Sequence, residues 1–277
     1  MISRVLSILL LTTCLVSNSG KAQVIPTEID SSREAEVIRI TLQKLDQVLK
    51  DKNGVPMLQV QGNIPVVTIG GNQKATKKMN DFYQNKRKAF EVQQAIDFKQ
   101  AQEDYKGRSE EERAYWEGYG LGMSYMPERL DEKVISLIEN NDEYTGGAHP
   151  NSWRYAQNFD PNTGRRLTLK DITTDEKAAI TFINQELLKQ TNKYEYKEYF
   201  FEGYEKNIKD ILTEDTWYLS DNGFVVISNQ YIISPHAVGI LEFTIPYEVF
   251  PYLKKEYRPL SKGVPNEVTS PMENKVY

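Results

Sequence analysis

The feature that most constrains the fold of this chain is a short turn between two apolar runs. The tetrad Asp51-Lys52-Asn53-Gly54 separates residues 36–50 from residues 55–62, and both runs are rich in Ile, Leu and Val. The spacing of apolar residues in the first run fits either a helix face or an alternating strand. Asn-Gly between two such runs favours strands, because both turn residues tolerate a positive φ. The sequence therefore predicts two long antiparallel strands.

Later segments predict both helices and strands. Residues 72–107 are rich in Lys, Gln and Ala and contain no proline, which indicates a long helix. Thr173–Glu176 has the spacing of a capping box, so we expect a helix from there through Leu188 and a second helical stretch at 196–212. Val134–Ile138 is apolar on both faces, as in a central strand. Other strands are expected at residues 151–159, 223–234 and 239–246.

Taken together, these elements predict an α+β fold with antiparallel sheets and with helices packed on one face, built as two small fused domains. The tyrosine-rich segment 194–204 is open to two interpretations. It could form a platform on which sugar rings stack. The more common structure for such a pattern is an amphipathic helix, here with Tyr196, Tyr199, Phe200 and Gly203 packed inward.

The N-terminus has the three-part pattern of a secretory signal peptide. A basic start precedes an apolar run of 12 residues, Val5–Val16, and small residues allow cleavage after Ala22. The run is shorter than the ~20 residues that span a bilayer as a helix. We therefore expect a signal peptide at 1–22 and a secreted or periplasmic protein with no transmembrane segment in its mature part. The alternative is a lipoprotein anchored through Cys14, which lies in a loose lipobox.

Charge and cysteine content narrow the classes of partner. The formal net charge is −5, and loss of Arg4 and Lys21 with the signal peptide makes it −7. Such a chain is poorly suited to nucleic acid, whose phosphates require clustered Lys and Arg, and better suited to a basic protein. Without Cys14 the mature chain has no cysteine, so a core must hold it together without disulfides. We expect no cofactor.

The densest stretch of candidate functional residues is Asn141–Asn151, which contains two adjacent glycines and one of the two histidines in the chain. We expect both glycines to permit backbone angles that other residues avoid. The histidine, His149, is most simply a structural residue that hydrogen-bonds the turn. It could instead bind a metal with His236, or act as a general base with Ser234, Asp142 or Glu143 as nominal partners. No spacing singles out a catalytic set, so we assign neither catalytic nor metal-binding residues.

Several motifs resemble a pair of cell-envelope domains. "DKNGVPMLQVQGNIPVV" and the later "MNDFY" resemble the PdaC-type accessory domain. "YTGGAHPN", "FDPNTGRRLTLKDI" and "YIISPHAVGILEFTIPYEVF" resemble the domain that follows it in RsiV-type anti-sigma factors. The resemblance implies a PdaC-like domain at 36–143 after a polar leader at 23–35, and an RsiV-like domain at 144–257. The proline-rich remainder, 258–277, is expected to be disordered.

The resemblance also implies a function. RsiV-type ectodomains sense lysozyme, and the same pair forms the non-catalytic part of the deacetylase PdaC. We therefore expect a non-enzymatic binding or sensing module that recognises lysozyme or a similar cell-wall hydrolase. A peptidoglycan-binding module is the alternative, and a hydrolase that uses the His149 loop is the second. His236 stands where the family motif favours an aromatic residue. The expected ligand-binding residues are Tyr144, Thr145, Gly146, Gly147, His149, Asn151, Tyr231, Pro235 and His236.

Overall fold

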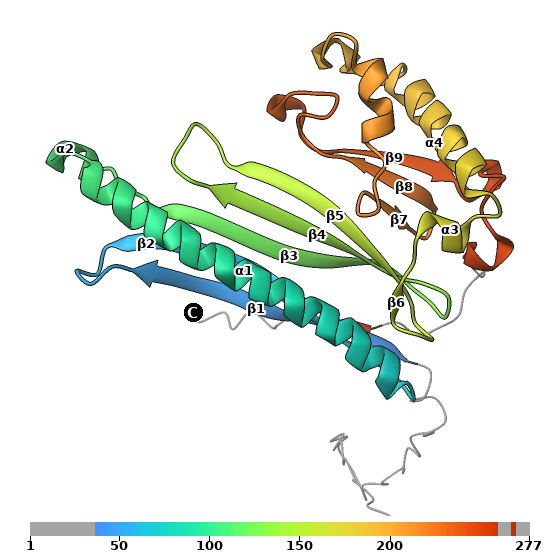
Figure 1. Cartoon of the computed structure of the whole chain (residues 1–277), viewed down its shortest axis with the longest axis horizontal. Helices are drawn as coiled ribbons and strands as arrows, with labels where there is room; N and C mark the ends of the chain where they lie inside the picture. Colours follow the sequence, from blue (N-terminus) through green and yellow to red (C-terminus); the bar gives the residue numbers. More distant parts are fainter. Residues whose placement is uncertain (1–36, 260–266, 270–277) are drawn as a thin grey trace, which may run out of the picture.

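The computed structural model describes residues 37–259 and 267–269 (Figure 1). The expected signal peptide, Cys14 and the polar leader lie outside these residues, as do residues 260–266 and 270–277 of the expected disordered tail. Residues 267–269 differ from that expectation, because they form strand β10 (Glu267–Thr269) in parallel with the first strand. Within the described residues, no helix has the length and apolar character needed to cross a membrane.

The predicted hairpin is confirmed: β1 (Ile38–Lys50) pairs antiparallel with β2 (Pro56–Ile69). The carboxylate of Asp51 closes the turn by accepting the backbone N–H groups of Asn53 at 2.9 Å and Val55 at 2.8 Å. Gly54 has a φ of +85°, whereas Asn53 keeps a negative φ. The turn therefore depends on one glycine and an Asp side chain, where the sequence predicted two residues with positive φ.

Seven strands form the first sheet in the order β10-β1-β2-β3-β4-β5-β6. The predicted central strand is confirmed within β4, which lies between β3 and β5. Most neighbours are antiparallel, but β2 and β3 are parallel because the long helix α1 (Gln73–Gly107) connects them as a crossover. The other strands of this sheet are β3 (Tyr119–Leu130), β4 (Ile135–Tyr144), β5 (Asn151–Asp160) and β6 (Arg165–Arg166).

Helix α1 covers one face of this sheet (Figure 1). Asn72 caps its start, since the Asn72 side chain accepts the N–H of Ala75 at 3.1 Å. The Asn80 side chain bonds both the N–H and the carbonyl of Val67 at 2.8 Å, which fixes the helix against β2. Tyr83 is fully buried against the sheet; burying a large apolar side chain contributes about 1.5–3 kcal/mol. A short helix, α2 (Glu110–Arg113), follows with a complete capping box at Ser109.

The second sheet contains β7 (Trp217–Leu219), β8 (Gly223–Ser228) and β9 (Leu241–Pro246), all antiparallel. In β9 the expected alternation is confirmed, with every second residue buried. Helix α4 (Glu176–Thr191) packs Ile183 and Leu187 into the core of this sheet. Its N-cap is Asp175 rather than the expected Thr173, and the capping box in this region belongs instead to α3 (Leu169–Ile172). Short 3₁₀ helices complete the second half: η2 (Lys197–Tyr199), η3 (Tyr204–Asp210), η4 (His236–Val238), η5 (Tyr247–Val249) and η6 (Lys255–Tyr257).

The expected helix at 196–212 is broken into η2 and η3, and the predicted inward packing is wrong for three of its four residues. Tyr196 and Tyr199 are 51% and 59% exposed, and Gly203 is also exposed, while Phe200 is buried. The physical reason is that the backbone leaves the helical region at Phe200, which is extended with a φ of −70° and a ψ of 153°, and again at Gly203, whose φ is +71°. An α-helix cannot continue through either conformation, so the periodicity of the tyrosines is not helical in space.

The two sheets are joined along β5. The Asn229 side chain bonds both the N–H and the carbonyl of Arg154, at 2.7 and 2.9 Å, and the N–H of Ala156 donates to the Asp215 carbonyl at 2.7 Å. The side chain of Asn158 donates to the carbonyl of Trp217 at 2.9 Å. The division expected between residues 143 and 144 falls inside the β4–β5 hairpin, and β5 and β6 remain in the first sheet.

Candidate functional site

The loop of the β4–β5 hairpin contains most of the predicted ligand-binding residues. Residues 145–151 are exposed, and Tyr144 at the base of the loop donates its hydroxyl to the Gly147 carbonyl at 3.1 Å. Gly146 has a φ of +83°, as predicted, but Gly147 does not have a positive φ. A β-carbon added to Gly147 would meet no atom within 4 Å. Only the first glycine is therefore required by the turn.

The two histidines of the chain lie in contact. The rings of His149 and His236 stack with centroids 3.6 Å apart and planes 8° from parallel. His149 Nδ1 lies 3.0 Å from the carbonyl oxygen of Pro150, and His236 Nδ1 lies 3.0 Å from Gln230 Oε1. The backbone carbonyl of Pro150 only accepts, so His149 Nδ1 carries the hydrogen in that contact.

The loop between β8 and β9 supplies the second half of this contact. Tyr231 has a φ of +67° and is 54% exposed; in the described residues it is the one non-glycine with a positive φ. Its N–H donates to the Ser234 carbonyl at 2.9 Å, which closes a tight turn ahead of Pro235. A tyrosine in this backbone region is strained, and such strain persists where surrounding contacts fix the chain.

We call residues 144–151 together with residues 230–238 the two-loop corner. The structure brings these two segments of the predicted site together through the His149–His236 stack. Asn151 pairs with Glu143 at the start of β5, and Thr145 is exposed at the tip. The role of each residue in ligand binding remains a prediction.

Two residues that hold the corner in place were missed from the sequence. Asn229 fixes the second loop to β5 through the backbone of Arg154. The Arg154 guanidinium donates to Asn140 Oδ1 at 2.7 Å and to Glu242 Oε1 at 3.0 Å, so it links the first sheet to β9. Alternation along a strand places Arg154 and Asn158 on one face of β5, but no sequence signal identified what that face would meet.

Among the described residues, no hydrogen bond joins Ser234, Asp142 or Glu143 to either imidazole. Ser234 Oγ is buried and has no hydrogen-bond partner among the described residues, so it is not joined to either imidazole. Asp142 accepts the hydroxyl of Ser152 at 2.6 Å. Burial, and then the neighbouring charge of Asp97, raises the pKa of Glu143. In the part of the chain that the structure describes, no group of three or more His, Cys, Asp or Glu could hold a metal ion.

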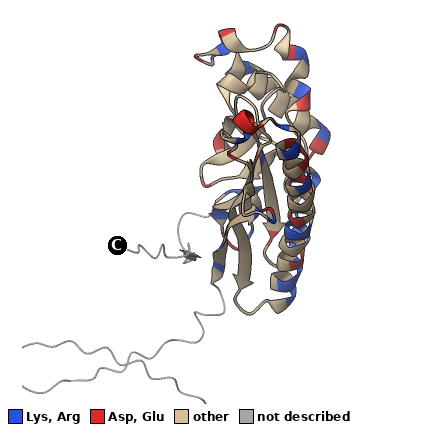
Figure 2. Ribbon diagram, turned by 90° about the vertical axis from the view of Figure 1, so that its left-hand side faces the viewer, with Lys and Arg blue, Asp and Glu red and all other residues tan. Residues whose placement is uncertain are grey.

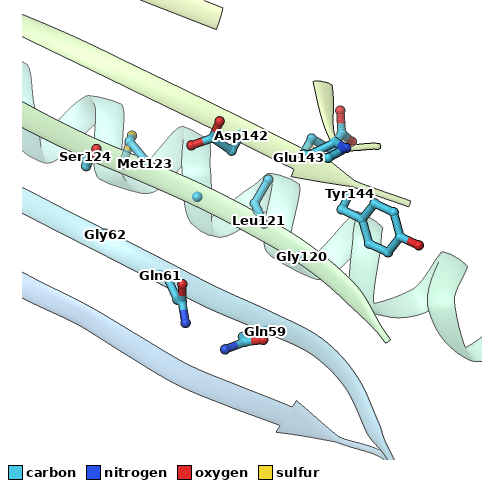
Figure 3. A pocket seen from close by; sticks show the side chains of 12 residues that line it. Gln59, Gln61, Gly62, Gly120, Leu121, Met123, Ser124, Asp142, Glu143 and Tyr144 are labelled. Atoms are coloured by element: carbon cyan, nitrogen blue, oxygen red, sulfur yellow. The ribbon is translucent and has the colours of Figure 1, made fainter. Parts of the chain in front are cut away.

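A groove of about 390 Å³ adjoins the corner on the face of the first sheet opposite α1 (Figure 3). It runs across β2, β3 and β4, and Tyr144 lies where it meets the hairpin. The sequence analysis did not identify this groove. The available signal was the Gly120-Leu121-Gly122 pattern in β3, since glycine is unusual inside a strand. Its polar lining includes Gln59, Gln61, Ser124, Asp142, Glu143 and Tyr144.

Two family models match the chain. Residues 52–152 match the family described as "Deacetylase PdaC", and residues 170–248 match "Protein of unknown function (DUF3298)". No curated protein matches.

Two solved structures resemble the fold. A DUF3298-family protein from Bacteroides fragilis is 21% identical with a TM-score of 0.57, and the match covers 80% of this chain and 96% of that one. A DUF3298-family protein from Pseudomonas aeruginosa is 14% identical with a TM-score of 0.52, and that match covers 79% and 97%. The first region therefore matches a PdaC-type family, as its motifs predicted, and the second region matches DUF3298; the RsiV-type resemblance of the second region stays a prediction.

Proposed function

We propose that this protein is a non-enzymatic binding or sensing module of the cell envelope that recognises a basic cell-wall hydrolase such as lysozyme. The recognition surface is the two-loop corner. The signal-peptide pattern at residues 1–22 supports a location outside the cytoplasm. The RsiV-like motifs support a hydrolase as the partner.

The observation that carries the proposal is the stack of His149 on His236. It fastens the exposed hairpin loop of the first sheet to the partly exposed loop of the second sheet, so that both belong to one surface. A pre-assembled surface loses little conformational entropy on binding, which favours affinity. Exposed Tyr231 adds an aromatic group of the kind enriched at protein interfaces.

Charge supports the choice of partner. The chain has a net charge of −5, and Asp142 and Glu143 are acidic residues at the base of the hairpin. An acidic surface attracts a basic partner and speeds its association, and this attraction weakens as salt rises. The name "Deacetylase PdaC" describes the matched family. For this chain we propose the binding role that accompanies the catalytic domain in PdaC.

The test is binding of lysozyme to the purified chain from Gln23 onward, at low salt and at ~0.15 M, where charges are screened beyond ~8 Å. We expect saturable binding that survives the higher salt and falls at least tenfold in His149→Ala and in Tyr231→Ala. Val92→Ala is the control, because Val92 is 61% exposed on α1 and outside the corner. Binding that vanishes at ~0.15 M, or that both corner variants retain, would overturn the proposal.

A further inference from the structure

We infer that the groove on the open face of the first sheet binds a short, uncharged oligosaccharide. By the open face we mean the face of the first sheet opposite α1. Figure 2 shows the sheet from the side, with α1 along its other face. This inference goes beyond the proposed function, because it concerns a different class of ligand and an adjoining surface that shares only Tyr144 and Pro150 with the two-loop corner.

The strand register builds the groove from two rows of residues that cross three strands. Gln59 pairs with Gly120, and Gly120 pairs with Tyr144. In the second row, two residues further along β3, Gly122 pairs with Gln61 on one side and with Asp142 on the other. Each row therefore has an amide on β2, a glycine on β3 and a larger polar side chain on β4. With strands about 4.8 Å apart, the rows span about 10 Å.

The two glycines are not needed by the backbone. Neither Gly120 nor Gly122 has a positive φ. A β-carbon at Gly120 would lie 3.6 Å from the nearest atom, Tyr144 Cβ, and one at Gly122 would lie 3.4 Å from Asp142 Cβ. By contrast, a β-carbon at Gly62 would lie 1.9 Å from the Met123 carbonyl oxygen, so Gly62 is required for close strand packing.

Glycine inside a strand usually weakens the strand. At Gly120 and Gly122 no backbone requirement for glycine offsets this loss of stability. The absence of side chains at these two positions instead leaves the groove unfilled. The floor is therefore bare backbone, which a ligand can approach closely. Asp142 Oδ2 lies over this floor, 3.5 Å from the position of a β-carbon on Gly122.

The lining has the chemistry that recognises sugar hydroxyls. Gln59 and Gln61 each offer two donors and an acceptor, and both are exposed. Ser124 offers a hydroxyl. Asp142 Oδ1 already accepts from Ser152, which orients the carboxylate and leaves Oδ2 over the floor as an acceptor.

Charge and size select the class of ligand. Asp142 supplies the charged side chain over the floor of the groove, and the lining contains no lysine or arginine from the described residues. The groove therefore disfavours phosphate- or carboxylate-bearing polymers and suits a neutral donor of hydroxyl and amide hydrogens. A volume of about 390 Å³ is near the lower end of the ~300–1,000 Å³ range of small-molecule sites. The Tyr144 ring at one end gives an aromatic face for a sugar ring.

The experiment is titration of the purified chain with two neutral probes, an N-acetylglucosamine hexamer and a glucose hexamer, followed by calorimetry. We expect saturable binding of one probe that 0.5 M NaCl leaves unchanged. Gly120→Ala should weaken it at least tenfold while the melting temperature stays the same or rises. Gly107→Ala is the matched control, since an added β-carbon there meets no atom within 4 Å and the residue ends α1.

Two further variants separate this inference from the proposed function. Gln61→Ala should weaken oligosaccharide binding and leave lysozyme binding unchanged, while His149→Ala should do the reverse. Failure of both probes to bind at millimolar concentration, or equal affinity in Gly120→Ala, would overturn the oligosaccharide site without touching the two-loop corner. Binding of an extended peptide in place of either sugar would also overturn it.

Discussion

The imidazole of His149, in the hairpin of the first sheet, lies flat against the imidazole of His236, in a loop of the second sheet. The two residues are 87 positions apart, and their ring nitrogens are hydrogen-bonded to separate partners, Pro150 and Gln230. The contact is thus a face-to-face stack between two independently oriented rings. It makes the position of one loop depend on the other.

Removal of one ring should loosen this contact. In His236→Ala we expect faster amide hydrogen exchange for residues 145–149 than in the wild-type protein at the same pH, because the hairpin loop loses the ring against which His149 stacks. Equal exchange rates in the two proteins would contradict this.

Asn158 should be a major contributor to the joint between the sheets. Its buried carboxamide accepts from Ser136 Oγ at 2.7 Å and from the N–H of Leu219 at 3.2 Å, and donates to the Trp217 carbonyl at 2.9 Å. Asn158→Ala leaves these buried groups without a partner, which should lower the free energy of unfolding by about 2–4 kcal/mol. Urea denaturation measures this. Exposed Asn207→Ala, which loses one long hydrogen bond of 3.4 Å, should change it by less than ~0.5 kcal/mol.

Asp97 should destabilise the protein at neutral pH. Asp97 is 2% exposed, and its Oδ2 has no hydrogen-bond partner among the described residues. Burial raises the pKa of its carboxyl group, and this effect exceeds the opposing effect of Gln93, which donates to Oδ1 at 2.8 Å. A raised folded-state pKa means that stability is full below the unfolded pKa of about 3.9 and falls as pH rises through the folded value.

Asp97→Asn should therefore increase the free energy of unfolding by about 1 kcal/mol at pH 7 and give no increase at pH 3. Thermal unfolding at both pH values measures the difference. Asp81→Asn, at an exposed ion pair with Lys77, should show neither effect. A loss of stability at pH 7 would mean that the carboxylate has a favourable partner.

Alkaline unfolding should involve Tyr119. Burial, followed by its 2.8 Å hydrogen bond to Asp104, raises the Tyr119 pKa to about 12. Since the unfolded pKa is about 10, the stability linked to this group is full below pH 10 and is lost as pH rises towards 12. Tyr119→Phe should lower the free energy of unfolding by about 1 kcal/mol at pH 8. Above pH 10 the free energy of unfolding should fall less steeply in this variant than in the wild-type protein. Tyr115→Phe, at an 80% exposed site, should leave the pH profile unchanged, as followed by urea midpoints from pH 8 to 12.

Local signals in the sequence predicted the local structure well. The Asn53-Gly54 turn and the uninterrupted helix of α1 are set by neighbouring residues, and both are confirmed. The segment around Tyr196 was predicted wrongly because its periodicity looks helical while the backbone leaves the helical region at Phe200 and again at Gly203. Strand pairing across α1 depends on contacts far apart in sequence, so the parallel β2–β3 pair could not be read from either strand.

The candidate site was predictable only where local sequence determines it. The two adjacent glycines indicated a turn, but they did not show that the turn requires glycine at position 146 and not at position 147. The approach of His149 to His236 depends on Asn229 holding the second loop to β5, which is a side-chain-to-backbone contact. The groove depends on register: Gly120 and Gly122 matter because of the residues beside them on β2 and β4.

The covering of β5 has a consequence for how the chain can be divided. The backbone groups of Arg154 and Ala156 on the outer edge of β5 are satisfied by Asn229 and Asp215, which belong to the second half. A fragment that ends at residue 166 would keep β5 but expose those groups as an open strand edge, which invites pairing between molecules and aggregation. The region that follows residue 166 thus covers an edge of the first sheet, and the two regions should be expressed as one piece.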